Sequence, residues 1–288
     1  MNSIVGFVVT LGCVFGGYMW AGGKLSIILK SLPYEMMMIG GAAIGAFICA
    51  NDMHTIKATG RDLVAIIKGP KWKREDYADL LCLMHELVRL CEDDPVEVER
   101  HIEDPENSDL FQKYPRILES HDFVELICDT LRSMLMNFDN VYQVEELLDK
   151  QLETMKDEDL HGSHALQTMA DALPALGIVA AVLGVIKTMA SIDKPPEVLG
   201  QMIGGALVGT FLGVFLAYGM VGPIASRVKQ IREQEAYFYG LMREVLVSSL
   251  HKNEISLCIE VARRSAPHGS RPSFTEVESA IKALRAAA

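Results

Sequence analysis

Charged residues are absent from four long stretches of this chain of 288 residues, and that absence constrains its fold more than any other feature. The uncharged stretches are residues 1–23, 36–51, 172–186 and 198–226. A helix needs about 20 apolar residues to cross the hydrocarbon core of a bilayer. The first and fourth stretches reach that length alone, and the other two reach it when Tyr34 and Met189 flank them at the interface.

We therefore expect an all-α integral membrane protein with four transmembrane helices, because hydrocarbon offers no water to unpaired backbone groups. The expected spans cover about residues 2–22, 34–51, 170–190 and 198–222. A buried core helix is the alternative for the two shorter stretches, and a signal peptide is the alternative for the first. The first three residues carry no basic charge, so we interpret the first span as a retained anchor.

Basic residues are distributed unevenly around the expected spans. Those that follow the second and fourth spans are Lys57, Arg61, Lys68, Lys71, Arg227, Lys229 and Arg232. The opposite loops hold only Lys24, Lys30 and Lys194. Because basic loops stay on the inner side of a membrane, residues 52–169, residues 223–288 and both chain termini are predicted to be cytoplasmic.

The two cytoplasmic segments are predicted to be a helical domain, residues 52–169, and a helical tail, residues 223–288. Apolar residues in the domain recur every three or four positions, which is the period of a helix. Three such stripes begin at Tyr77, Phe123 and Val141. Pro95 after Asp94 indicates a helix start, and Ser120 is a candidate N-cap.

The sequence shows no catalytic or cofactor motif. Its six cysteines form no CxxC pair, and it has no phosphate-binding glycine loop or GxSxG nucleophile turn. His161 and His164 lack a third ligand nearby, so we interpret them as part of a loop and not as a zinc site. A formal net charge of −11 disfavours a nucleic-acid binder. We expect no enzyme activity, no cofactor and no bound metal.

The interiors of the expected spans hold no Asp, Glu or His. Ionisable groups are costly inside a membrane and mark ion or proton paths where they occur. A chain without them has no side chain on which to carry a proton across the bilayer. If this chain moves protons, we expect the carboxylate to come from a partner chain.

Several segments resemble the MotA family of flagellar motor stator subunits. Residues 173–184, Leu-Pro-Ala-Leu-Gly-Ile-Val-Ala-Ala-Val-Leu-Gly, resemble its third membrane helix, and residues 208–219 followed by Pro223 resemble its fourth. Further similar segments are residues 99–105, 114–118 and 271–274. The resemblance extends over nearly the whole chain and includes the order of four spans around one large loop.

The resemblance implies a partner and a mechanism. It implies a ring of subunits, a pentamer in this family, around two transmembrane helices of MotB in the bacterial inner membrane. An aspartate of MotB would carry the ion and so supply the carboxylate that this chain lacks. Ion flow would turn the ring, whose cytoplasmic domains would push the rotor protein FliG through charge contacts.

The resemblance also assigns site residues. Its two functional prolines correspond to Pro174 and Pro223, and its pore-facing threonine corresponds to Thr210. Sodium-driven relatives carry a threonine at the position of Ala181. Since alanine has no hydroxyl to help coordinate a dehydrated sodium ion, we favour protons as the coupling ion, with a sodium-driven stator as the alternative.

The rotor-contacting glutamate of the family corresponds to Glu99. The family's rotor-contacting arginine lies eight residues earlier, where this chain has Cys91. Arg89 and Arg100 are the nearest basic residues and the candidates to replace it. Two other functions stay open: an ExbB/TolQ-type energiser of outer-membrane processes, and a membrane scaffold without transport. The first usually has three spans, which the extra N-terminal spans disfavour.

Overall fold

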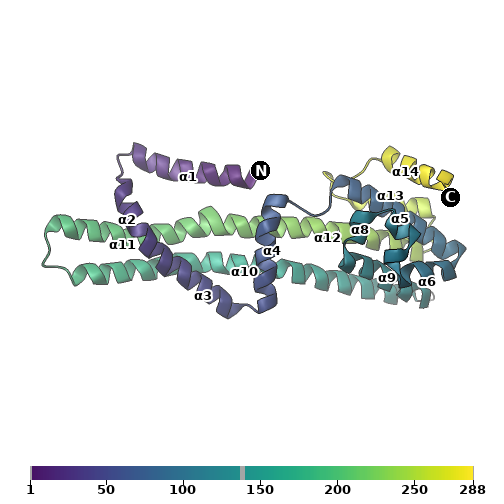
Figure 1. The fold of residues 1–288 in the computed structure, drawn as a ribbon, viewed down its shortest axis with the longest axis horizontal. Helices are drawn as coiled ribbons and strands as arrows, with labels where there is room; N and C mark the ends of the chain where they lie inside the picture. The colour runs from purple at the N-terminus through teal and green to yellow at the C-terminus, as the bar shows by residue number, and fades with distance from the viewer. Residues whose placement is uncertain (1, 137–139, 288) are drawn as a thin grey trace. The chain divides into compact units, whose positions relative to one another are not determined.

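The computed structural model describes residues 2–136 and 140–287, and every regular element within these ranges is helical (Figure 1). The prediction of an all-α fold is therefore confirmed. The chain divides into two compact units, each made from two separate stretches of sequence. The first unit comprises Met1–Gly69 and Asp159–Ile231, and the second comprises Pro70–Glu158 and Arg232–Ala288.

The first unit contains the apolar helices. Its elements are α1 (Asn2–Trp20), α2 (Leu25–Glu35), the π-helical turn η1 (Met36–Gly40), α3 (Gly41–Ala50), α4 (Met53–Lys68), the C-terminal part of α10 (Val141–Met189), α11 (Pro196–Leu216), the π-helical turn η3 (Ala217–Val221) and the start of α12 (Gly222–Leu250). In the described part of the chain, four helical runs are long and apolar enough to cross a membrane. This agrees with the four spans expected from the sequence.

The second span is longer than the sequence indicated. Elements α2, η1 and α3 form one apolar run, Leu25–Ala50, whereas the uncharged stretch predicted a span over residues 34–51. Pro33 lies inside α2 and does not end it. Helical hydrogen bonding continues after the proline, since the Met36 N–H donates to the carbonyl oxygens of Leu32 and Pro33. The extension brings Glu35 into the middle of the run.

The third and fourth spans belong to long helices. α10 runs without a break through residues 161–164, so the interpretation of His161 and His164 as part of a loop is wrong. Gly162 and Ser163 are weak helix formers, so local propensity does not explain the continuation. The Ser163 hydroxyl donates to the Leu160 carbonyl within the helix at 2.9 Å. α12 continues past Pro223 after the π-helical turn η3.

The boundary between the units differs from the boundary expected at residues 51 and 52. α4 clusters with the apolar helices and not with the second unit. The helix starts where Asp52 accepts a hydrogen bond from the Thr55 N–H at 3.0 Å. Its buried side chains are the polar Thr55, Thr59 and Asp62. The second unit accordingly begins at Pro70.

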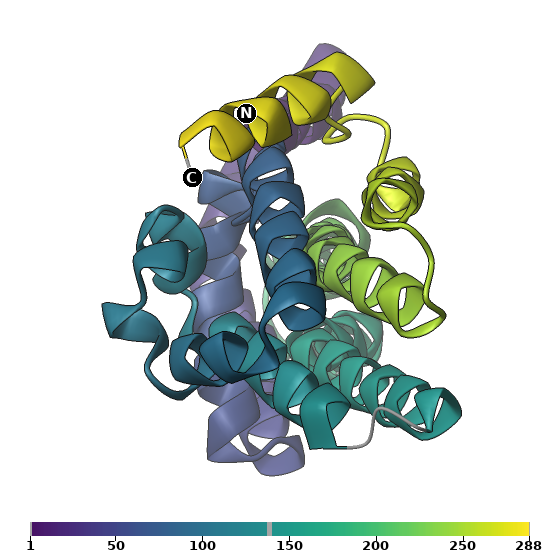
Figure 2. The same cartoon turned by 90° about the vertical axis from the view of Figure 1, so that its right-hand side faces the viewer.

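The second unit is built from shorter helices around a large apolar core. Its own elements are α5 (Arg74–Asp93), α6 (Pro95–Glu103), the 3-10 turn η2 (Pro105–Asn107), α7 (Asp109–Gln112), α8 (Pro115–Leu118), α9 (His121–Met136), α13 (Ile255–Ser265) and α14 (Phe274–Ala287). The first part of α10 and most of α12 complete it. Figure 2 shows α13 and α14, in yellow, beside α5, in blue.

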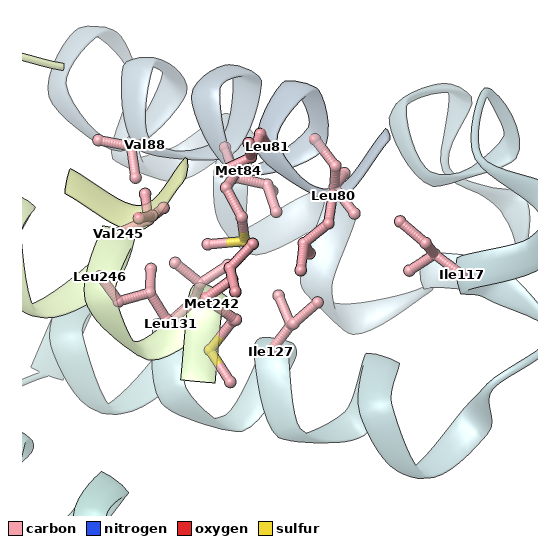
Figure 3. Close-up of a cluster of buried hydrophobic side chains, with 14 of the residues drawn as sticks. Leu80, Leu81, Met84, Val88, Ile117, Ile127, Leu131, Met242, Val245 and Leu246 are labelled. Carbon is pink, nitrogen blue, oxygen red and sulfur yellow. The ribbon is translucent and has the colours of Figure 1, made fainter. Parts of the chain in front are cut away.

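The core of the second unit joins α5, α8, α9 and α12 (Figure 3). Its labelled side chains are Leu80, Leu81, Met84, Val88, Ile117, Ile127, Leu131, Met242, Val245 and Leu246. Phe238 is fully buried and stacks on Trp72 with a centroid distance of 4.0 Å. The apolar stripes that begin at Tyr77 and Phe123 supply α5 and α9, as predicted.

Candidate functional site

The α10–α11 pair brings two helix backbones into direct contact. A Cβ atom built on Gly213 would lie 2.6 Å from the Leu173 carbonyl oxygen and 2.8 Å from the Gly177 Cα. One built on Gly184 would lie 3.0 Å from the Ala206 Cα. Small residues permit such approach in lipid, where helices associate by close packing and not by the hydrophobic effect.

Two of the predicted ion-path residues lie on this pair. A Cβ on Gly209 would lie 3.2 Å from the backbone nitrogen of Ala181, so Gly209 of α11 lies opposite Ala181 of α10. Thr210 follows Gly209 on α11, and both Thr210 and Ala181 are partly exposed. The structure therefore brings Ala181 and Thr210 to one level of the α10–α11 pair.

A carboxyl group occupies the same level, which corrects the expectation that the interiors of the spans hold no acidic residue. Glu35 is 5% exposed, and a Cβ on Gly209 would lie 2.7 Å from its Oε2 atom. Within the described residues, Oε2 has no hydrogen-bond partner. Glu35 is the functional candidate that sequence reasoning missed, because an intramembrane carboxyl marks an ion path more often than it stabilises a fold.

The two predicted prolines occupy different settings. Pro174 is inside α10, next to Leu173, whose carbonyl oxygen faces Gly213. Pro223 is exposed at the start of α12, directly after the π-helical turn η3. A proline removes one backbone hydrogen bond from a helix, so both positions are points of local weakness.

The predicted rotor-contact residues lie on the surface of the second unit. Glu99 and Arg100 are exposed on α6, and Arg89 is exposed on α5. The Arg100 guanidinium pairs with Glu97 at 2.7 Å, and the Arg89 guanidinium pairs with Asp93 at 3.3 Å. α6 begins as predicted, since Asp94 accepts hydrogen bonds from two N–H groups of its first turn.

Cys91 is not a surface position. Its side chain is 7% exposed and belongs to the core of the second unit. Burial raises the pKa of its thiol to about 11, so the thiol is neutral at physiological pH. A charge that contacts another protein cannot come from this position, which leaves Arg89 and Arg100 as the basic candidates.

No candidate metal site occurs among the described residues. They contain no group of three or more His, Cys, Asp or Glu side chains placed to hold a metal ion. His161 and His164 are three positions apart within α10. The arrangement that remains is a set of closely packed membrane helices with one buried carboxyl, together with a charged helix face on the second unit.

Two family models match the chain. The model described as the motility protein A N-terminal region matches residues 4–95, and that of the MotA/TolQ/ExbB proton channel family matches residues 123–239. The first covers the two N-terminal spans and the second covers the α10–α11 pair.

Individual relatives and solved structures agree with this assignment. Motility protein A of Salmonella typhimurium is 36% identical over 286 residues, which is 99% of this chain and 96% of the relative. Motility protein A of Escherichia coli shows the same identity and coverage. The chain is also similar in fold to a structure of C. jejuni MotAB, with a TM-score of 0.71 at 19% identity. The match covers 95% of this chain and 98% of that one. On the evidence of sequence and fold together, the chain belongs to the motility protein A family.

Proposed function

We propose that this chain is a stator subunit of the bacterial flagellar motor that conducts protons together with MotB and drives the rotor. The observation that carries this proposal is the full-length similarity to motility protein A combined with the α10–α11 pair. A second solved structure similar in fold, from Bacillus subtilis, is described as a flagellar MotAB stator complex (TM-score 0.68, 21% identity, covering 95% of this chain and 99% of that one). The proposed role is transport and force generation, without catalysis of a reaction.

The ion path is proposed to run along the α10–α11 pair in a homopentameric ring around MotB. Ala181 and Thr210 would face the path, and a MotB aspartate would carry the proton. Ala181 offers no hydroxyl, so a proton fits this level better than a dehydrated sodium ion. A sodium-driven stator is the alternative, and swimming speed measured against external sodium distinguishes the two.

The rotor contact is proposed to be the exposed end of α6. Glu99 would meet a basic residue of FliG, with Arg100 or Arg89 providing the opposite charge. Each of these side chains is exposed, and the two arginines are held only by surface ion pairs. Breaking such a pair to contact another protein costs at most about 1 kcal/mol. Both chain termini and the second unit would be cytoplasmic, and the first unit would lie in the inner membrane.

The test of the rotor contact is a charge reversal. Glu99→Lys is expected to reduce swimming torque, and a reversed charge on the FliG partner is expected to restore it. Glu153→Lys, at a position on α10 that is also exposed, is the matched control and is expected to leave torque unchanged. Failure of every FliG reversal to compensate would remove the proposed steering role of Glu99.

The proline positions allow a second test. Pro174→Ala and Pro223→Ala are expected to leave the chain inserted in the membrane but to lower motility, because each restores a backbone hydrogen bond to a helix that is proposed to move. Membrane insertion is checked by fractionation and motility by swimming speed. Wild-type swimming in both variants would contradict a role of the prolines in gating.

An energiser of the ExbB/TolQ type is the second candidate, since the matched channel family includes those proteins. The separate match of residues 4–95 to the motility protein A N-terminal region favours the stator. A pulldown from the native cell discriminates between them. MotB and FliG are the expected partners of a stator, whereas ExbD or TolR would identify an energiser.

A further inference from the structure

The first unit contains a cavity of about 220 Å³ beside the N-terminal half of α1. Its walls come from α1, α4, η3 and α12. The residues that line it are Ser3, Gly6, Phe7, Thr10, Ile66, Tyr218, Gly219, Pro223, Ile224 and Arg227. From Ser3 to Thr10 it follows α1 for roughly 10 Å, at 1.5 Å per residue.

The lining of the cavity combines apolar side chains with one positive charge. Phe7, Ile66 and Ile224 provide the apolar surface, and Arg227 provides a positive charge. The Arg227 guanidinium donates to the neutral amide oxygen of Gln230 at 3.3 Å and pairs with no carboxylate among the described residues. A site of this kind suits an amphipathic anion better than it suits water, which needs several polar partners.

The position of the cavity at the ends of two apolar spans is the level at which lipid headgroups are expected in a membrane. It joins the beginning of the first span to the end of the fourth, and Arg227 is the first charged residue after the longest uncharged stretch. Tyr218 is 71% exposed, and tyrosine favours the boundary between hydrocarbon and water. Basic pockets between membrane helices on the cytoplasmic side bind the headgroups of anionic lipids.

We propose that this cavity binds the headgroup region of an anionic phospholipid, whose phosphate pairs with Arg227 and whose acyl chains leave along the exposed face of α1. Arginine suits this role because its planar guanidinium donates two parallel hydrogen bonds to a phosphate. A cavity of about 220 Å³ holds only part of a phospholipid, so the acyl chains remain in the bilayer. The proposal depends on a membrane location but not on the role in motility.

A neighbouring copy of this chain is a poorer occupant than a lipid. A neighbouring copy could offer Arg227 only the acids at the ends of its uncharged stretches, such as Asp52 and Asp171, and only where one subunit interface places them opposite it. An anionic phospholipid, in contrast, brings a phosphate to the headgroup level in every part of the membrane. Because the occupant would touch Tyr218, Gly219 and Pro223, it would contact the π-helical turn that precedes α12.

The test measures lipid binding to the full-length protein, purified in mild detergent with whatever subunits copurify, by native mass spectrometry. Short-chain phosphatidylglycerol is compared with phosphatidylcholine, and Arg227→Gln is compared with wild type. Lys57→Gln is the matched control, because Lys57 is an exposed basic residue on α4 that does not line the cavity. Gly6→Leu is a blocking variant, since a Cβ at Gly6 meets no atom within 4 Å and the larger side chain can occupy the space.

The expected result is a preference for phosphatidylglycerol that Arg227→Gln weakens about tenfold, roughly the effect of one charge-assisted hydrogen bond. Gly6→Leu is expected to weaken binding as well, Lys57→Gln to leave it unchanged, and inorganic phosphate not to compete. Equal binding of the two lipids, or unchanged binding by Arg227→Gln, would overturn the proposal. Competition by inorganic phosphate would indicate a free-phosphate site. Loss of ring assembly in Gly6→Leu, with lipid binding unchanged, would indicate that a neighbouring subunit occupies the cavity. Either result would also overturn the proposal.

Discussion

The two units of this protein hold their helices together in opposite ways. In the first unit, glycines bring backbones into contact, and half of its main buried cluster is alanine: Ile39, Ala43, Leu173, Ala180, Leu212 and Ala217. In the second unit, large side chains such as Phe238, Phe123 and Tyr77 fill the space between helices. The contrast follows from the surroundings, because burial of apolar side chains stabilises a fold in water but gives helices in lipid no comparable force.

One buried acid from each unit shows a related contrast. Asp76 in the second unit is 1% exposed and fully paired: it accepts from the Lys73 N–H at 2.6 Å and from the Arg116 guanidinium at 3.0 Å. Glu35 in the first unit is buried without a hydrogen-bond partner for Oε2 among the described residues. A paired acid stabilises its fold, whereas an unpaired one costs stability and calls for a functional explanation.

The largest expected effect is the loss of a core aromatic side chain in the second unit. Phe238→Ala should lower the free energy of unfolding by about 3–5 kcal/mol, because it leaves a cavity beside Trp72. Tyr237→Ala is the control, since Tyr237 is 54% exposed on the same helix. Thermal unfolding of the full-length protein in detergent measures both variants. Equal losses of stability would contradict a core made by large side chains.

The next effect is the reverse substitution, from small to larger, in the first unit. Gly213→Ala should destabilise the α10–α11 pair by about 1–3 kcal/mol, because the added Cβ meets backbone atoms of α10. Gly200→Ala on the same helix meets no atom within 4 Å and should be neutral. Protease resistance and thermal unfolding distinguish the two. A stable Gly213→Ala variant would show that the backbones are not in contact.

Asp76 and Glu35 allow a direct comparison. Asp76→Ala should cost about 2 kcal/mol through the loss of hydrogen bonds to a charged group. Methionine has a similar length and no charge, and Glu35→Met breaks no hydrogen bond of the buried Oε2 atom. The substitution should therefore leave the free energy of unfolding unchanged or raise it. Both are followed by unfolding in detergent at neutral pH. Marked destabilisation by Glu35→Met would assign Glu35 a structural role and weaken its candidacy as an ion-path residue.

The smallest effect is a pH dependence in the second unit. Hydrogen bonds from Arg263 and Arg264 lower the pKa of Glu260 to about 2, from an ordinary value of 4.5. Because the folded state holds the lower pKa, its stabilisation is present above pH 4.5 and is lost as the pH falls toward 2. Glu260→Gln should therefore reduce stability at pH 7 by less than about 1 kcal/mol and have no effect near pH 2.

The control for that pH series is Glu278→Gln, which removes one carboxyl from an exposed pair with Lys282. It should change the unfolding temperature less than Glu260→Gln does. A difference between Glu260→Gln and wild type that grows as the pH falls would have the wrong sign and would contradict the assignment.

The helices that could be predicted from the sequence are those determined by interactions between residues close together in the chain. The apolar stripe from Tyr77 predicted α5, and the pair of Asp94 and Pro95 predicted the start of α6, because periodicity and capping act within one helix. It did not predict that α10 continues through His161 and His164, since a helix supported by neighbouring helices tolerates residues that would end an isolated one.

The candidate site was less predictable, because its key features depend on contacts between distant segments. A search for uncharged stretches ends at Glu35 and so places it at the edge of the second span and not in its interior. Its burial depends on Gly209, which is more than 170 residues away in sequence and leaves room for the carboxyl group. Cys91, in contrast, continues the apolar stripe from Tyr77 at helical spacing, so its place on the buried face follows from local periodicity, whereas Arg89, two residues earlier, faces solvent.

The central proposal is that this chain forms the wall of a proton path and that a partner supplies the acid that carries the proton. Proton flux into liposomes measures this directly, with the purified chain alone and with the chain copurified with MotB. We predict no flux from the chain alone, flux from the complex, and loss of that flux when the MotB aspartate is replaced by asparagine. Flux through the chain alone, or through the complex with the neutral partner, would contradict the proposal and would make Glu35 the first residue to examine as the carrier.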